Sequence, residues 1–278
     1  MIKQIGNHMI RSSKLQHEDI NFLENYYSTN GKFPCFKQVL VETRTDCNNR
    51  CPFCPQTFNK KNLGVMNWNC YTAIIDQLAE LSFSGRVALF LSNEPLLEDR
   101  LEDMIVYAKR KSPRFFLDIT TNARLLTVEK LDSLFKFGLD NILINDYRND
   151  REDYPEKISP NLEPIVNAYK NNPKVFIKKR SLQEKLPNYA GNIPQEFDSK
   201  DFGFCNYPFR KLTIAYTGDI LLCCNDFMYN TFFGNVMINS LVDCWNNPEM
   251  NEIRLNLLKN RRVGFCKRCN EVQNYSVF

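Results

Sequence analysis

Three cysteines on one short loop constrain this chain more than any other feature of its sequence. Cys47, Cys51 and Cys54 form the pattern C-x-x-x-C-x-x-C, directly after an apolar segment that we predict to be a strand. Three thiolates can hold three irons of a [4Fe–4S] cluster, which leaves the fourth iron open to a ligand from outside the protein. A cluster that only transfers electrons needs a fourth cysteine, and none follows at short spacing. A zinc loop or a chance spacing is the alternative interpretation.

Composition limits the partners that this chain can have. Its 278 residues carry a net charge of +4 with a pI near 8.4, which is too mild to indicate nucleic-acid binding. The longest apolar runs, such as residues 87–91, are far too short to cross a bilayer, and the polar N-terminus lacks the apolar core of a signal peptide. We therefore expect a soluble cytoplasmic protein without nucleic-acid or membrane partners.

The numbers of cysteine and histidine residues narrow the chemistry. Eleven cysteines, an odd count, favour metal or catalytic thiols over a disulfide framework in a cytoplasmic chain. The only histidines are His8 and His17. Beyond residue 17, no histidine is therefore available for a mixed Cys/His zinc site, a Ser–His–Asp triad or a general base. We expect Cys35 and Cys70 to be buried apolar thiols rather than ligands.

Hydrophobic periodicity predicts an α/β protein. Strands and helices alternate up to about residue 180, which predicts βαβ units around a parallel sheet, either an open barrel or a doubly wound sheet. The predicted strands are residues 38–43, 87–91, 115–120, 141–145 and 174–179, and the predicted helices are residues 70–81, 101–111, 127–137 and about 162–169. An irregular stretch follows, then a hairpin of residues 211–216 and 219–222, and a helix over residues 248–258.

Further motifs, in the same order along the chain, resemble those of the radical S-adenosylmethionine superfamily. Residues 92–95 (SNEP) follow the second predicted strand, where that family usually has Gly-Gly-Glu-Pro. Residues 120–122 (TTN) end the third strand and match the family's Thr-Asn-Gly region, with Ala123 in place of the glycine. These motifs fall at the C-terminal ends of strands, where parallel barrels carry their active sites.

The resemblance implies a binding site for S-adenosylmethionine. Glu94 is expected to accept a hydrogen bond from the methionyl ammonium, Phe53 to lie near the adenine, and Thr121 and Asn122 near the ribose. A solvated strand end explains Asn145, Lys178 and Arg180 nearly as well as a cofactor contact. The residues assigned to the cofactor are Phe53, Ser92, Asn93, Glu94, Thr121, Asn122, Asn145 and Arg180.

Four cysteines near the C-terminus form a second set. Cys205 and Cys223 have the spacing C-x(12)-G-x(4)-C, and Cys266 and Cys269 follow as C-x-x-C. This pattern resembles the SPASM domain, or twitch domain in its shortened form, and implies a fully ligated auxiliary [4Fe–4S] cluster. Two cysteine pairs suit Zn²⁺ equally well, so zinc stays open as an alternative.

The resemblance also implies a domain organisation and a set of cofactors. We expect an N-terminal extension (residues 1–36), a partial (β/α)6 TIM-like barrel (residues 37–200) and a small twitch/SPASM-like auxiliary-cluster domain (residues 201–278). The cofactors are S-adenosylmethionine and two [4Fe–4S] clusters, one of which binds S-adenosylmethionine. An electron donor of the flavodoxin or ferredoxin type is the expected protein partner.

The function that the resemblance implies is radical chemistry on a small molecule. Reductive cleavage of S-adenosylmethionine gives a 5′-deoxyadenosyl radical, which removes hydrogen from a sugar, an aminocyclitol or a similar natural-product intermediate. From about residue 38 the chain is similar to radical dehydrogenases of an aminocyclitol alcohol, in which the auxiliary cluster accepts an electron.

Two residues beside the second cysteine set are candidates for catalysis. Cys224 is either a hydrogen-atom donor, as an epimerase needs, or a spare buried thiol, and Asp226 is a candidate base. A radical epimerase and an enzyme that modifies a ribosomal peptide are therefore the alternatives to a dehydrogenase.

Overall fold

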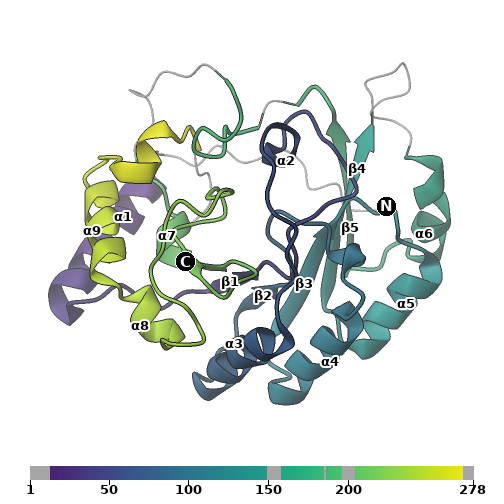
Figure 1. The fold of residues 1–278 in the computed structure, drawn as a ribbon, viewed down its shortest axis with the longest axis horizontal. Coiled ribbons are helices and arrows are strands. Elements are labelled where there is room, and N and C mark those ends of the chain that lie inside the picture. The colour runs from purple at the N-terminus through teal and green to yellow at the C-terminus, as the bar shows by residue number, and fades with distance from the viewer. Residues whose placement is uncertain (1–12, 149–157, 185, 196–203, 272–278) are drawn as a thin grey trace.

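One sheet organises the chain, with the strand order β5-β4-β3-β2-β1-β6-β7 (Figure 1). The computed structural model describes residues 13–148, 158–184, 186–195 and 204–271. The strands are β1 (Gln38–Val41), β2 (Arg86–Ala88), β3 (Phe116–Thr121), β4 (Asn141–Arg148), β5 (Val175–Ser181), β6 (Lys211–Ile214) and β7 (Ile220–Leu221).

Strands β1 to β5 are parallel neighbours, and a helix follows each of the first four. These helices are α3 (Trp68–Glu80), α4 (Leu101–Lys111), α5 (Val128–Phe137) and α6 (Glu163–Ala168). Figure 1 shows them side by side along the same face of the curved sheet. The α/β class predicted from the alternating pattern and the partial barrel implied by the family resemblance are therefore confirmed, and α4 has the predicted bounds.

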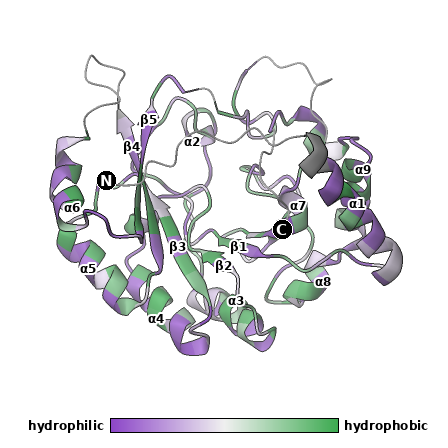
Figure 2. Cartoon of the chain, turned by 180° about the vertical axis from the view of Figure 1, so that it is seen from behind, coloured by the Kyte–Doolittle hydropathy of each residue, from purple (hydrophilic) through white to green (hydrophobic). Residues whose placement is uncertain are grey.

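Local sequence explains where these helices begin and what they bury. In α3, apolar side chains at positions 71, 74, 75 and 78 form one buried stripe, and the N-cap Asn67 accepts a hydrogen bond from the backbone of Asn69. Helix α5 begins after the N-cap Thr127 and ends at Gly138, whose φ of 112° suits glycine. Figure 2 shows α4 and α5 alternating between hydrophobic and hydrophilic residues, as expected for helices with one face on the sheet.

The predicted hairpin forms, and it joins the main sheet. Strands β6 and β7 pair antiparallel, and β6 pairs parallel with β1, with Leu212 opposite Val39. Six strands are thus parallel, but the sixth comes from the C-terminal region and lies beside β1 instead of following β5. The predicted boundary between residues 200 and 201 lies outside the described residues, and the division into domains stays a prediction.

A second, smaller core holds the N-terminal and C-terminal helices together. Leu23 of α1 (Ser13–Asn30) packs with Phe33, Phe209 and Leu257, the last of which belongs to α9 (Pro248–Leu258). Helix α9 has the predicted bounds. The first twelve residues of the predicted N-terminal extension lie outside the described residues.

The remaining helical segments are short. They are α2 (Pro55–Phe58), α7 (Tyr207–Arg210), α8 (Leu241–Trp245), η1 (Pro95–Leu97), η2 (Pro160–Leu162) and η4 (Gly264–Arg268). In the described ranges, no helix is both long and apolar enough to cross a membrane.

The prediction for the two isolated cysteines is half right. Cys70 is buried in the main core, as expected. Cys35 is exposed, because the neighbouring Phe33 and Phe36 take the inward positions and leave the thiol between them on the outside.

Candidate active site

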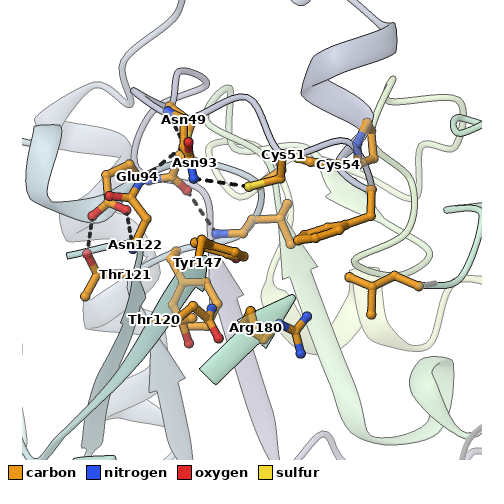
Figure 3. A pocket seen from close by; sticks show the side chains of 18 of the residues that line it. Asn49, Cys51, Cys54, Asn93, Glu94, Thr120, Thr121, Asn122, Tyr147 and Arg180 are labelled. Carbon is orange, nitrogen blue, oxygen red and sulfur yellow. Dashed lines mark hydrogen bonds between the residues drawn. The ribbon is translucent and has the colours of Figure 1, made fainter. Parts of the chain in front are cut away.

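A cavity of about 230 Å³ opens at the C-terminal ends of β1 to β5 (Figure 3). Figure 2 shows that the upper ends of β4 and β5 are hydrophilic, in contrast to β3. The cavity is lined by all three cysteines of the first loop and by all eight residues predicted to contact S-adenosylmethionine. Those residues are Cys47, Cys51, Cys54, Phe53, Ser92, Asn93, Glu94, Thr121, Asn122, Asn145 and Arg180. The structure thus brings them together, while their individual roles stay predictions.

Amide groups surround the sulfur atoms of the first loop. The side chain of Asn49 donates to Cys51 Sγ at 3.2 Å, and its backbone N–H donates to Cys47 Sγ at 3.4 Å. The side chain of Asn122 approaches Cys47 Sγ at 3.6 Å and donates to Asn48 at 2.7 Å. Hydrogen bonds of this kind orient thiolates and tune a cluster that they hold.

The thiols of this loop are also close enough to affect one another. Burial, together with the neighbouring Cys54 and Cys47, raises the pKa of Cys51 to about 12. Burial likewise raises the pKa of Cys47 and of Cys54. Buried thiols lose their protons when they bind a metal, so metal binding here releases protons. Three convergent thiols from one loop are the donor set for a cluster with one open iron.

Glu94 is held beside the cysteine loop. Its carboxylate is only 2% exposed and accepts hydrogen bonds from Thr121 Oγ1 at 2.6 Å, the Asn122 backbone at 2.8 Å and the Leu96 backbone at 3.1 Å. Its own N–H donates to the carbonyl of Asp46, the residue before Cys47. Burial raises the pKa of Glu94, and the three hydrogen bonds offset part of this rise. The carboxylate is therefore placed to accept hydrogen bonds from a cationic group beside the cysteine loop.

Two aromatic rings and a guanidinium line another part of the cavity. The rings of Phe53 and Tyr147 lie 5.8 Å apart, and the guanidinium of Arg180 lies 6.0 Å from the Phe53 ring. Arg180 also pairs with Glu184 at 3.1 Å. A planar group such as adenine fits against surfaces of this kind.

The second cysteine set converges from three segments. Cys205 precedes α7, Cys223 follows β7, and Cys266 and Cys269 belong to η4 and the residue after it; all four are buried. Burial raises the pKa of Cys223, and the neighbouring Cys224 and the other three thiols of the set raise it further. The donor set fits a fully ligated cluster.

Polar groups also support this second set. Asn225 approaches Cys269 Sγ at 3.7 Å, and Arg262 donates to the Cys269 carbonyl at 2.6 Å. Over the described ranges, no three His, Cys, Asp or Glu side chains lie close enough to share a single metal ion. This geometry does not separate zinc from an iron–sulfur cluster, and iron content distinguishes the two.

Cys224 and Asp226, the two predicted catalytic residues, do not line the cavity. Cys224 is partly buried; burial raises its pKa, and the nearby Lys211 offsets part of the rise. The carboxylate of Asp226 is 1% exposed and accepts four hydrogen bonds from Asn230 and Thr231, so it shapes its own turn. Catalytic roles for both residues stay predictions.

A buried ion pair near the cavity has no signal in the sequence. Lys61 donates to Glu42 at 2.9 Å, to Ser92 Oγ at 3.1 Å and to the Tyr229 hydroxyl at 2.9 Å. Glu42 accepts further hydrogen bonds from Ser92 and Tyr229, both at 2.7 Å. Lys61 also lies 4.1 Å from the ring of Phe227. The pair thus ties the cavity wall at Ser92 to the turn that follows β7.

We predict that Lys61→Met destabilises the protein by about 3–5 kcal/mol, because it leaves the charge of Glu42 buried without its partner. The side chains of Lys61 and Glu42 are 5% and 0% exposed. The measurement is urea unfolding of the reconstituted protein under anaerobic conditions, monitored by circular dichroism.

Lys130→Met is the matched control for this variant. Lys130 pairs with Glu102 at 3.0 Å, but the two side chains are 34% and 30% exposed. The control should lose less than about 1 kcal/mol. Equal losses in the free energy of unfolding in the two variants would show that the buried pair stabilises the protein no more than the exposed pair does.

Comparison with known proteins gives two matches along the chain. Residues 41–171 match the radical SAM superfamily, and residues 205–270 match SPASM, an iron–sulfur cluster-binding domain. The first match contains Cys47, Cys51 and Cys54, and the second contains all four cysteines of the other set. Together they imply S-adenosylmethionine and iron–sulfur clusters as cofactors.

Two relatives are similar in sequence. The S-adenosyl-L-methionine-dependent 2-deoxy-scyllo-inosamine dehydrogenase of Niallia circulans is 27% identical over 244 residues, which are 85% of this chain and 94% of that protein. The tungsten-containing aldehyde ferredoxin oxidoreductase cofactor-modifying protein of Pyrococcus furiosus is 29% identical over 104 residues, or 37% of this chain and 29% of that protein.

Solved structures share the fold. The crystal structure of BtrN in complex with AdoMet and 2-DOIA has a TM-score of 0.74 and 24% identity, covering 88% of this chain and 98% of that one. The structure of Streptococcus suis SuiB bound to the precursor peptide SuiA has a TM-score of 0.55 and 13% identity, covering 91% and 74%. The partial barrel with its C-terminal cysteine region is thus a known architecture.

Proposed function

Because this chain belongs to the radical S-adenosylmethionine superfamily and carries a SPASM iron–sulfur domain, we propose that it oxidises an alcohol group of a small polar metabolite. A sugar, an aminocyclitol or a similar natural-product intermediate is the substrate class. The similarity to the 2-deoxy-scyllo-inosamine dehydrogenase of Niallia circulans over most of both chains supports this class.

One observation carries the proposal: a single segment links the three-cysteine loop at the cavity to a second, buried set of four cysteines. Residues 187–193 connect the two, since the Asn192 carbonyl accepts from Asn59 near the first loop and Asn188 bonds to Asn270 beside Cys269. A radical oxidation of an alcohol releases one electron and the hydroxyl proton after the hydrogen atom has left, and the proton passes to a base or to solvent. A second cluster linked to the cavity gives the electron a destination.

The bound cofactors supply the reactive chemistry: a radical that removes a hydrogen atom from the carbinol carbon, and a second cluster that accepts the remaining electron. The residues of this chain supply position and charge. Glu94 holds the ammonium of S-adenosylmethionine, Phe53 and Tyr147 flank its adenine, and Asn49 and Asn122 orient the thiolates of the first loop. A flavodoxin-type or ferredoxin-type protein is the expected electron donor.

The test uses the reconstituted protein with S-adenosylmethionine, a reductant and 2-deoxy-scyllo-inosamine together with other amino alcohols and polyols. We expect 5′-deoxyadenosine and a ketone in equal amounts, and the Cys224→Ala variant should keep the same turnover. A product with an inverted alcohol, lost in Cys224→Ala, would instead identify an epimerase. The position of Cys224 outside the cavity wall favours the first outcome.

A further inference from the structure

The segment of residues 187–193 is fastened to both cysteine loops. The side chain of Asn59 donates to the Asn192 carbonyl at 2.5 Å, on the side of the first loop. On the other side, the Asn188 backbone donates to Asn270 Oδ1 at 2.6 Å, and its side chain donates to the Arg268 carbonyl at 2.8 Å. Asn270 returns a hydrogen bond to Asn188 at 3.2 Å. The backbone here is therefore held from two directions.

The centre of this segment has a backbone conformation that most residues avoid. Tyr189, Ala190 and Gly191 have φ angles of 49°, 55° and 87°, all in the left-handed region. This region is unfavourable for tyrosine and alanine because their Cβ atoms crowd the backbone. Such conformations persist only where the surroundings enforce them, and they cluster at ligand sites. This backbone conformation fixes the direction in which the Tyr189 side chain leaves the backbone.

The segment that carries this side chain links the regions of the two cysteine sets. Tyr189 lines the cavity. Its neighbours along the chain reach both sets: the Asn188 backbone donates to Asn270 beside Cys269, and the Asn192 carbonyl accepts from Asn59, which follows the first loop. Tyr189 is therefore an aromatic residue of this wall on a segment that contacts regions beside both sets.

The hydroxyl of Tyr189 has no hydrogen-bond partner among the residues that the structure describes. Two other tyrosines of this chain have one: Tyr71 donates to the Met104 carbonyl and Tyr229 to Glu42. Tyr189 is half-buried at the cavity wall, and a phenol there without a partner among the described residues is free to bond to a ligand. A ligand in the cavity would satisfy it.

We propose that Tyr189 is a substrate-binding residue, whose hydroxyl bonds to a hydroxyl or amino group of the substrate and holds the substrate between the two clusters. This inference rests on the proposed oxidation of a small polar metabolite and adds the residue that orients it. The ring sets how far the hydroxyl lies from the backbone of residue 189. The hydroxyl then favours substrates that have a polar group where it can form a hydrogen bond. Substrates that lack a polar group there should bind less well.

The test is Tyr189→Phe, which removes the hydroxyl and keeps the ring. We expect the KM for 2-deoxy-scyllo-inosamine, or for the best amino alcohol or polyol of the panel, to rise about 5- to 10-fold. Iron content and the slow cleavage of S-adenosylmethionine without substrate should stay at the level of the unmodified protein. A role in packing alone would not raise KM while leaving these two quantities unchanged.

Tyr169→Phe is the matched control, because the Tyr169 hydroxyl bonds to Asp132 on the outer surface, far from the cavity wall. If Tyr189→Phe and Tyr169→Phe have the same KM as the unmodified protein, Tyr189 does not bind the substrate. If the unmodified protein oxidises no member of the panel, the proposed function fails and this inference fails with it.

Discussion

Replacing Cys51 by alanine should abolish cleavage of S-adenosylmethionine. Cys51 is one of three thiols that converge on the cavity, and Asn49 donates a hydrogen bond to its sulfur. Two thiols cannot hold a cubane cluster with only one open iron. Residues that merely orient metal ligands already contribute 10- to 100-fold to activity, so losing a ligand should cost more than about 100-fold. The measurement is 5′-deoxyadenosine formed after reduction with dithionite.

Cys35→Ala is the control for this variant, because Cys35 is exposed and lies outside the cavity wall. It should form 5′-deoxyadenosine at the rate of the unmodified protein. A Cys51→Ala variant that keeps this activity would mean that the first loop does not hold the reactive cluster.

Replacing Cys266 and Cys269 together should separate the two halves of the reaction. Both thiols are buried in the second set, and the first loop does not share them. We therefore expect 5′-deoxyadenosine formation to continue, while ketone formation falls by more than about 100-fold because a metal ligand set has been removed. The measurement compares the two products in one reaction mixture.

Cys244→Ala is the control for the double variant, since Cys244 is equally buried and belongs to α8 of the same region. It should keep both products in the same ratio as the unmodified protein. Full ketone formation in the double variant would remove the argument that the auxiliary cluster takes the electron, and the dehydrogenase proposal with it.

Local sequence predicted most of the helices and strands. The bounds of α4 and α9 agree with the prediction: α4 has a clear helical period, and α9 begins with Pro248 directly after its N-cap Asn247. The hairpin of β6 and β7 was predictable from its Thr-Gly turn. The parallel pairing of β6 with β1 was not, since about 170 residues separate them and no local pattern specifies which strand edge is free.

Some residues of the candidate site were likewise predictable from the sequence, and others were not. Residues within motifs, such as Glu94 and Asn122, were placed at the cavity by the sequence because strand ends in a parallel sheet meet at one edge. Lys61 was not predicted, because a lysine in a polar loop normally lies in solvent, and its burial depends on Glu42 and Tyr229 from distant segments. Tyr189 lies in a segment with family resemblance, but only the folded backbone shows its conformation.

The iron and sulfide content of the protein after reconstitution without oxygen tests the central claim most directly. Two cubane clusters require about eight irons and eight sulfides per chain, falling to about four of each in Cys266→Ala/Cys269→Ala. A content near four in the unmodified protein, or one zinc ion in place of the second cluster, would contradict the two-cluster account.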